Sequence, residues 1–192
     1  DLALEASDIS GFENRRAKSA KHGKLRGLSV IQMVEQASGP RPEYAELRFD
    51  ASGTVTVLAG TKGQGQGHDT MYKVMISDML GMDTDDIRFE EGDTDKVSFG
   101  MGTVGSRSAV TGGGAVRYAA DKIIEKGKKI AAHMLEAAEV DIEFDQGRFL
   151  VTGTDKQVSI QNVAKAAFTP AAVPPGIEIG LYENATYTPE AA

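Results

Sequence analysis

The sequence predicts an α+β fold in which β-hairpins pack with one amphipathic helix and one long helix. Apolar and polar residues alternate on both sides of short turns in residues 45–60 and 141–154, a pattern typical of hairpins. Residues 68–81 and 116–138 instead carry apolar side chains at helical spacing. Because hairpins flank these helices, the order of elements favours α+β over a doubly wound sheet.

Composition excludes several classes of protein. The chain has 192 residues, 41% of them hydrophobic, enough for one substantial core or two small lobes. A net charge of -7 argues against nucleic acid as a partner, since binding phosphates needs clustered Lys and Arg. The absence of cysteine excludes disulfides, zinc thiolates and cysteine-held iron–sulfur clusters within these residues.

We expect a cytoplasmic protein without a membrane span. No apolar stretch approaches the ~18 residues that would suggest one, and the first residues do not resemble a signal peptide. The chain begins without Met and ends without an obvious terminal element. We therefore expect it to be part of a longer protein.

The first elements lead from a polar segment into an apolar one. Residues 8–23 are polar and basic and predict an exposed helix, so we assign 1–24 to a connector helix. The apolar run in 24–36 predicts a buried strand. Gly39 and two prolines then predict a loop over 37–44.

The next elements alternate between strands and helices. A hairpin over 45–60 turns at residues 50–53, and a helix over 68–81 ends at the C-cap Gly81, with its methionines in the core. A short strand at 86–93 and the long helix at 116–138 follow. These assignments rest on periodicity together with the turn and cap residues.

The last elements are a hairpin, a short helix and a tail. The hairpin over 141–154 turns around Asp145, Gln146 and Gly147, and residues 158–168 predict a strand or cap followed by a short helix. Residues 169–192 contain four of the six prolines, which predicts an irregular tail or linker. We therefore place one domain at 25–168.

Two glycine-rich loops each precede a helix. The first, GTKGQGQGHDT, spans residues 60–70, and the second, KVSFGMGTVGSRS, spans 96–108. Unpaired N–H groups at a helix N-terminus favour anions, and glycine lets the main chain approach a ligand closely. The spacing required for a P-loop or a dinucleotide-binding motif is absent. The candidate binding residues are Gln64, Gly65, Gln66, Gly67, Gly105, Ser106, Arg107 and Ser108.

Several residues near these loops have more than one interpretation. His68 fits either a catalytic base or a residue that caps or packs the helix, and Arg107 fits either a ligand contact or a structural partner of the acidic run 83–95. That run itself suggests either a metal site or, as the better interpretation, a solvated acidic edge. The three glycines at 112–114 call for close approach of a ligand or another backbone. The histidines show no metal-ligand spacing, so we assign no catalytic residue and no metal ligand.

The chain resembles the molybdenum-binding large subunit of the xanthine oxidase family, most closely of the aerobic carbon monoxide dehydrogenase type. The resemblance lies in four segments in family order: RGLSVIQMVEQASG, TVTVLAGTKGQGQGHDT, IRFEEGDTDKVSFGMGTVGSRSAVTGGGAV and DIEFDQGRFLVTGTDKQVSI. It implies a molybdenum-cofactor-binding-domain-like fold whose two loops hold molybdopterin carrying molybdenum. The dinucleotide form with cytosine is implied for a bacterial source, and the cofactor's dithiolene sulfurs hold the metal.

The same resemblance implies partner subunits, and it implies that the isolated chain lacks part of the active site. The partners are the rest of the large subunit, a flavin-binding medium subunit and an iron–sulfur small subunit, and residues 35–42 border the substrate pocket. Family subunits are several times longer, and the segment with their Gly-x-Gly-Glu base has no counterpart here. The prediction is therefore the cofactor-binding portion of a molybdenum hydroxylase that oxidises carbon monoxide, an aldehyde or an N-heterocycle, inactive as an isolated chain. The alternatives are a non-catalytic cofactor carrier and a scaffold that retains only the fold.

Overall fold

The computed structural model describes residues 2–34, 37, 39 and 41–190. The chain divides into two compact units, residues 1–34 and residues 35–192. All buried apolar residues of the core lie in the second unit. The fold and the predicted binding residues therefore belong to residues 35–192.

The first unit is helical and then extended. Helices α1 (Leu2–Ala6) and α2 (Phe12–Ala20) flank a 3-10 turn at Ile9–Gly11, and Asp8 caps that turn by accepting a hydrogen bond from the N–H of Gly11. None of these helical residues is buried. A helix therefore forms in the segment predicted to be helical, and its role as a connector stays a prediction.

The predicted strand at residues 24–36 was wrong for its described part. Residues 24–34 form neither helix nor strand, and residues 35–36 lie outside the described residues. Leu25 and Val34 are fully exposed, and Ile31 and Met33 are largely so. An apolar run becomes a buried strand only against a partner strand, and the described part of this unit contains no strand.

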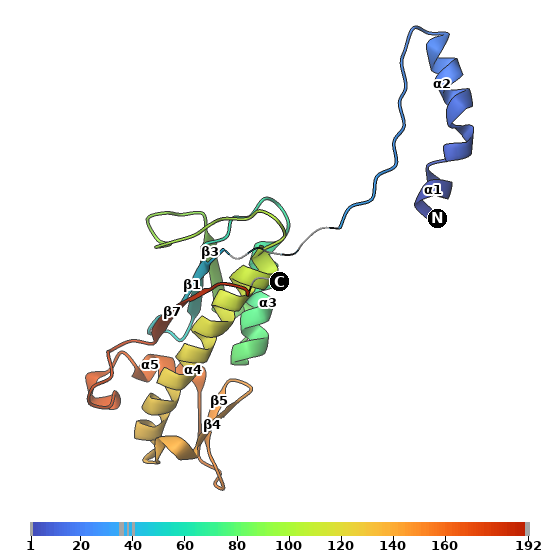
Figure 1. Ribbon diagram of the computed structural model, residues 1–192. Coiled ribbons are helices and arrows are strands. Elements are labelled where there is room, and N and C mark those ends of the chain that lie inside the picture. The colour runs from blue at the N-terminus through green and yellow to red at the C-terminus, as the bar shows by residue number, and fades with distance from the viewer. Residues whose placement is uncertain (1, 35–36, 38, 40, 191–192) are drawn as a thin grey trace. The chain divides into compact units, whose positions relative to one another are not determined.

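The main sheet of the second unit has four strands in the order β3-β2-β1-β7 (Figure 1). The strands are β1 (Glu43–Phe49), β2 (Val55–Ala59), β3 (Ile87–Glu91) and β7 (Tyr182–Tyr187). β1 pairs antiparallel with β2 and β7, whereas β2 pairs parallel with β3. The predicted first hairpin and its turn are confirmed, since the N–H of Gly53 donates to the carbonyl of Asp50 at 3.0 Å.

Two helices cover this sheet. Helix α3 (His68–Leu80) packs against β3 and α4, and helix α4 (Gly113–Leu135) packs against β1 and β7 (Figure 1). Gly81 ends α3 in the left-handed conformation with φ of 60°, as predicted. One π-helical turn, Ser108–Gly112, leads into α4. The mixture of helix and sheet confirms the predicted α+β class.

The three consecutive glycines before α4 are explained by side chains of other elements. A Cβ on Gly112 would meet the hydroxyl of Tyr72, and one on Gly114 would meet the ring of Tyr187. On Gly113 it would lie 2.9 Å from the methyl group of Met75. The expected close approach is therefore made by protein side chains, not by a ligand or another backbone.

A second, three-stranded sheet lies against the C-terminal half of α4. Strands β4 (Ile142–Asp145), β5 (Arg148–Val151) and β6 (Gln157–Ser159) form it in that order, all antiparallel. The predicted turn at Asp145, Gln146 and Gly147 is confirmed, and helix α5 (Ile160–Ala166) is capped at its N-terminus by the side chain of Ser159. Short 3-10 turns occur at Thr84–Asp86, Glu139–Asp141 and Pro170–Ala172.

The sequence predicts an irregular tail, but part of this tail forms a strand. Residues 182–187 form β7 and pair with all but the last residue of β1, while Leu181 and Ala185 are buried. Lys122 of α4 also donates to the carbonyl of Asn184 at 2.8 Å. The segment YENATY has little apolar patterning of its own, and its strand conformation depends on β1 as a partner.

No helix among the described residues is both long enough and apolar enough to cross a bilayer.

Candidate functional site

The two glycine-rich loops lie side by side in the structure. We call residues 60–67 loop 1 and residues 99–108 loop 2. The N–H of Gly102 donates to the carbonyl of Gly60 at 3.2 Å, and the N–H of Lys62 donates to Oγ1 of Thr103 at 3.0 Å. A Cβ on Gly60 would lie 2.7 Å from the Cα of Gly100, so the two main chains touch. The structure therefore brings together the two loops that the sequence predicts to face one ligand.

The exposed residues of both loops present main chain to solvent. Six of the eight predicted binding residues are exposed, namely Gln64, Gly65, Gln66, Gly67, Gly105 and Ser106. Gly65, Gly67 and Gly105 have positive φ of 98°, 81° and 58°, a conformation that favours glycine. A Cβ on any of the three would meet no atom within 4 Å. This open space leaves room for a ligand against the loop backbones.

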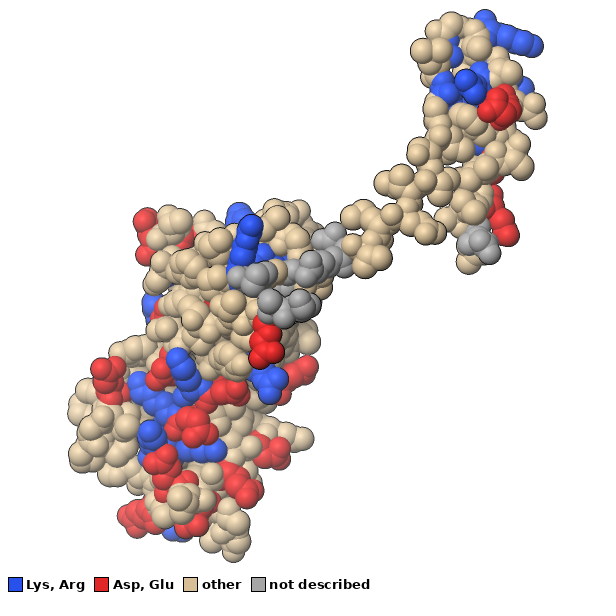
Figure 2. Space-filling view, viewed as in Figure 1, with Lys and Arg blue, Asp and Glu red and all other residues tan. Residues whose placement is uncertain are grey.

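Loop 1 ends at the N-terminus of a regular helix. Gly67 is the N-cap of α3, and its carbonyl accepts the N–H of Met71 at 3.0 Å. Gly67 offers no side chain to cap the first N–H groups of α3, which have no partner within the helix. Such N–H groups and the helix dipole favour an anion at this end. Figure 2 shows mostly uncharged side chains at the loop end of the second unit and mixed charges over α4.

Arg107 points into the protein. It is 2% exposed and forms an ion pair with Glu43, which is fully buried at the start of β1. The Arg107 guanidinium also donates to the carbonyls of Gly102 and Pro42, both at 2.7 Å. The structural interpretation of Arg107 named the wrong partner: its ion pair is with Glu43 and not with the acidic run 83–95. We call Glu43 and Arg107 the buried junction.

The buried junction ties Arg107, near the end of loop 2, to the main chain of Met101 and Gly102 near its start. The Glu43 carboxylate accepts the N–H of Met101 at 3.2 Å, while Arg107 bonds the carbonyl of Gly102. Nε of Arg107 is buried and has no hydrogen-bond partner within the described part of the chain. A cofactor contact by Arg107 stays a prediction.

Ser108 is also turned inward. Its hydroxyl lies 2.9 Å from that of Thr103, and its carbonyl accepts the hydroxyl of Tyr72 at 3.0 Å. Tyr72 lies in α3 and is fully buried, and this burial raises its pKa to about 12. The hydroxyl of Tyr72 thus stays protonated and ties α3 to the end of loop 2. A cofactor contact by Ser108 likewise stays a prediction.

His68 packs beneath loop 1. It is 4% exposed, its Nδ1 lies 2.9 Å from the Glu91 carboxylate and its Nε2 lies 3.0 Å from Nε2 of Gln66. Its ring also meets Tyr72 edge-on, with centroids 5.7 Å apart. Both ring nitrogens are engaged with protein groups, which favours the packing interpretation over a catalytic base.

The acidic run behaves as a surface edge. Asp83, Asp85 and Asp86 are exposed, Asp83 caps a 3-10 turn, and Glu90 pairs with Lys96 at 2.7 Å. Within residues 2–34 and 41–190, no three His, Asp or Glu side chains converge in a way that could hold a metal ion. The arrangement agrees with a solvated edge.

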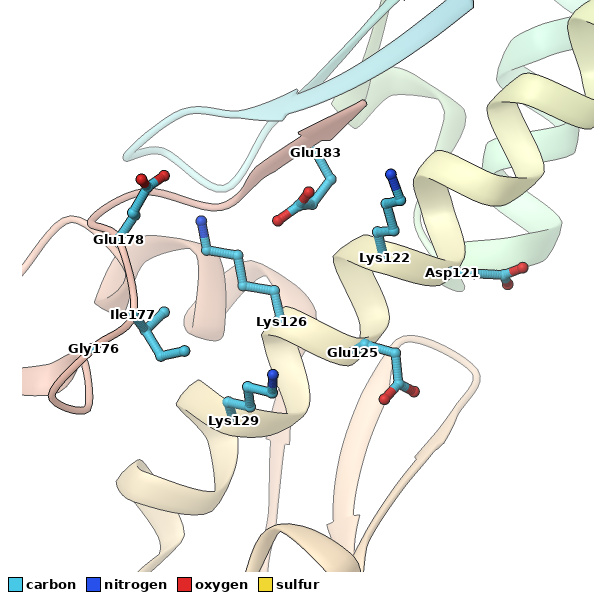
Figure 3. Close-up of a pocket in the computed structure, with 9 residues that line it drawn as sticks. All are labelled: Asp121, Lys122, Glu125, Lys126, Lys129, Gly176, Ile177, Glu178 and Glu183. Atoms are coloured by element: carbon cyan, nitrogen blue, oxygen red, sulfur yellow. The ribbon is translucent and has the colours of Figure 1, made fainter. Parts of the chain in front are cut away.

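A groove of about 450 Å³ lies away from the loops, between α4 and residues 176–183 (Figure 3). Two of its three lysines contact the C-terminal segment: Lys122 donates to the carbonyl of Asn184, and Lys126 lies 4.7 Å from the centroid of the Tyr182 ring. Glu178 and Glu183 face these lysines across the groove (Figure 3). We therefore attribute the groove to the docking of the C-terminal segment on α4.

Sequence reasoning missed the residues that support the loops. Thr103 links loop 1 to Ser108, Glu91 holds His68, and Glu43 holds Arg107. Thr103 lies within the second glycine-rich segment, so the sequence pattern could have identified it. Glu43 gives no local signal, because its partners are 58 and 64 residues away in sequence.

Comparisons with known proteins agree with this arrangement. The family described as "Molybdopterin cofactor-binding domain" matches residues 2–192. The carbon monoxide dehydrogenase large chain of Afipia carboxidovorans is 45% identical over 98% of this chain and 26% of its own length. The nicotine 6-hydroxylase large subunit of Paenarthrobacter nicotinovorans is 36% identical over 93% of this chain and 24% of its own.

Solved structures give the same result. Reconstituted CO dehydrogenase from Oligotropha carboxidovorans superposes with a TM-score of 0.73 and 32% identity, over 99% of this chain and 26% of that one. Quinoline 2-oxidoreductase from Pseudomonas putida 86 gives 0.72 and 30% over the same shares. This chain thus spans about a quarter of the length of these relatives. It belongs to the molybdopterin cofactor-binding domain family.

Proposed function

We propose that this chain is the cofactor-binding portion of a molybdenum hydroxylase large subunit and that loops 1 and 2 hold molybdopterin from two sides. The observation that carries the proposal is the direct contact between the loops, with open space at the positive-φ glycines of both. An elongated, phosphate-bearing pterin fits main-chain N–H groups and amide side chains that converge from two segments. The cytosine dinucleotide form is part of this proposal.

The exposed loop residues have distinct roles in this proposal. Gln64 and Gln66 supply amide donors and acceptors, and Gly65, Gly67 and Gly105 let the main chain approach the ligand. Ser106, which is exposed in the left-handed conformation, supplies a hydroxyl. The N-terminus of α3 favours the phosphate. Arg107 contributes by shaping loop 2 through Glu43.

The bound group would supply the redox chemistry for oxidising carbon monoxide, an aldehyde or an N-heterocycle with oxygen from water. The residues described here bind and orient it and exclude solvent from one side. Electrons would leave through iron–sulfur and flavin subunits, and the base that completes the active site would come from elsewhere in the large subunit. The isolated chain is therefore inactive in this proposal.

The test is the molybdopterin content of the complete protein that contains these residues, measured by fluorescence of the oxidised pterin. We expect Gln66→Ala and Ser106→Ala each to lower the content about tenfold, as the loss of one well-made hydrogen bond would. Gln157→Ala, an exposed glutamine in β6, is the matched control and should leave it unchanged. Equal contents in the wild type and both loop variants would contradict the proposal.

A further inference from the structure

A chain of hydrogen bonds runs from a loop 1 backbone group to a buried carboxylate. The N–H of Gln64 donates to Oε1 of Gln66 at 2.5 Å, and Nε2 of Gln66 lies 3.0 Å from Nε2 of His68. Nδ1 of His68 lies 2.9 Å from Oε2 of Glu91. Four groups from loop 1, α3 and β3 are thus connected in series.

The direction of every proton in this chain follows from its first member. A backbone N–H is always a donor, so the Gln66 atom that faces Gln64 is the amide oxygen. The Gln66 atom that faces His68 is then the amide nitrogen, also a donor. Nε2 of His68 has to accept, which places the ring proton on Nδ1, where it donates to Glu91.

These hydrogen bonds leave the second N–H of the Gln66 amide available for a ligand. The Gln66 amide nitrogen carries two protons, and only one of them is directed at His68. The other lies on the exposed side chain in loop 1 and suits an acceptor such as a phosphate or pterin oxygen. Without the accepting Nε2, only the N–H of Gln64 would hold the amide in this orientation.

We propose that His68 and Glu91 are positioning residues that fix the Gln66 amide with a donor toward the ligand. Burial supports this role, since the side chains of His68 and Glu91 are 3% and 14% exposed. Glu91 is further held by the hydroxyl of Thr61 at 3.3 Å, which also contacts Tyr72 at 3.2 Å. The inference rests on the proposed binding of molybdopterin by loop 1.

The first test reads the ring proton without any cofactor. Long-range proton–nitrogen correlation spectra of the ¹⁵N-labelled chain are expected to show His68 protonated at Nδ1 and bare at Nε2. His22→Gln and His133→Gln, both at exposed histidines, assign the other two signals. A His68 ring protonated at Nε2 would overturn the inference. In Glu91→Gln, the Gln66 side-chain amide signal should shift, whereas it should not in the neighbouring variant Glu90→Gln.

The second test separates positioning from general support of the fold. In the complete protein, His68→Gln is expected to lower molybdopterin content about tenfold when Gln66 is present and to have no further effect in a Gln66→Ala background. Equal losses in the two backgrounds, or no loss with either His68→Gln or Glu91→Gln, would overturn the inference. Melting temperatures of all variants identify any that fail to fold, and Glu91→Gln then replaces His68→Gln in the cycle.

The outcomes also distinguish this inference from the function on which it rests. If Gln66→Ala itself leaves the molybdopterin content unchanged, the proposed role of loop 1 fails. The positioning of the amide is then judged by the His68 ring proton and the Gln66 amide signal alone. If Gln66→Ala lowers the content and His68→Gln does not, the function stands and the positioning fails.

Discussion

At the scale of single residues, the buried junction of Glu43 and Arg107 determines the shape of loop 2. Both charges are removed from water, and each is compensated by the other and by main-chain groups of loop 2 and the preceding segment. A buried pair of this kind adds little net stability relative to apolar residues, but removing one partner strands a charge in the interior.

Arg107→Met tests this reasoning. We expect the free energy of unfolding in urea to fall by about 3 to 5 kcal/mol, because Glu43 is left buried without its counter-ion. The matched control is Arg88→Met, which removes an exposed arginine 3.3 Å from Asp50 and should cost no more than about 1 kcal/mol. Similar losses in the two variants would show that the junction is not desolvated.

Tyr72 gives the protein a predicted sensitivity to alkaline pH. In the unfolded chain a tyrosine has a pKa of 10.0, and in the fold burial raises the pKa of Tyr72 to about 12. Between these values the unfolded state binds fewer protons than the folded state, so stability falls as pH rises. The stabilisation is complete below pH 10 and is lost by about pH 12, a change of about 2 to 3 kcal/mol.

The measurement compares the free energy of unfolding in urea of the wild type and Tyr72→Phe from pH 9 to about pH 12. The stability of Tyr72→Phe should not show the decrease that ionisation of Tyr72 causes between pH 10 and about pH 12. Tyr118→Phe, at a half-exposed tyrosine of α4, should follow the wild type. Parallel curves for the wild type and Tyr72→Phe would contradict the prediction.

At the scale of elements, glycines allow neighbouring side chains to pack closely against α4. Gly127 is buried in the middle of the helix, where a Cβ would meet the ring of Phe149 from β5. Glycine disfavours a helix interior by about 1 kcal/mol relative to alanine. Here that cost permits the second sheet to pack closely on α4.

Gly127→Ala is therefore expected to destabilise the protein by about 1 to 3 kcal/mol, against the helix preference for alanine, because the core is overfilled. Thermal and urea unfolding give the measurement. Combining it with Phe149→Leu, which frees space at the contact, should cost less than the sum of the two single changes. An additive or stabilising result would contradict close packing at this point.

At the scale of the whole molecule, the second unit is closed by its last strand. β7 covers the edge of β1 and lies against α4, so the start and end of this unit are joined in one sheet. Without β7, the main-chain groups of β1 would form an open edge next to loops 1 and 2.

Two truncations test the role of β7. A chain ending at residue 187 keeps β7 and should unfold at the same urea concentration as the full chain. A chain ending at residue 180 should lose its cooperative transition or aggregate, because β1 is exposed at the sheet edge. A cooperative transition of unchanged midpoint in the shorter chain would contradict this role.

Much of this architecture could be predicted because its causes are local. The hairpins follow from alternation around Asp50 and Gly147, and α3 from periodicity with Gly81 as its cap. The glycine loops could be identified as candidate binding loops for the same reason. The strand predicted at 24–36 failed in its described part because an apolar run does not contain its own partner.

The sequence by itself determined the hairpins, the helices and the α+β class, since these depend on patterns within a few residues of each other. It also determined the family, through four matching segments spread along the chain. Only the tertiary structure decided that loops 1 and 2 touch, that Arg107 turns inward to Glu43 and that residues 182–187 complete the sheet. It also placed the ring of His68 against the side chain of Gln66. The physical reason is that hydrogen bonds and burial between residues distant in sequence leave no periodic trace in it.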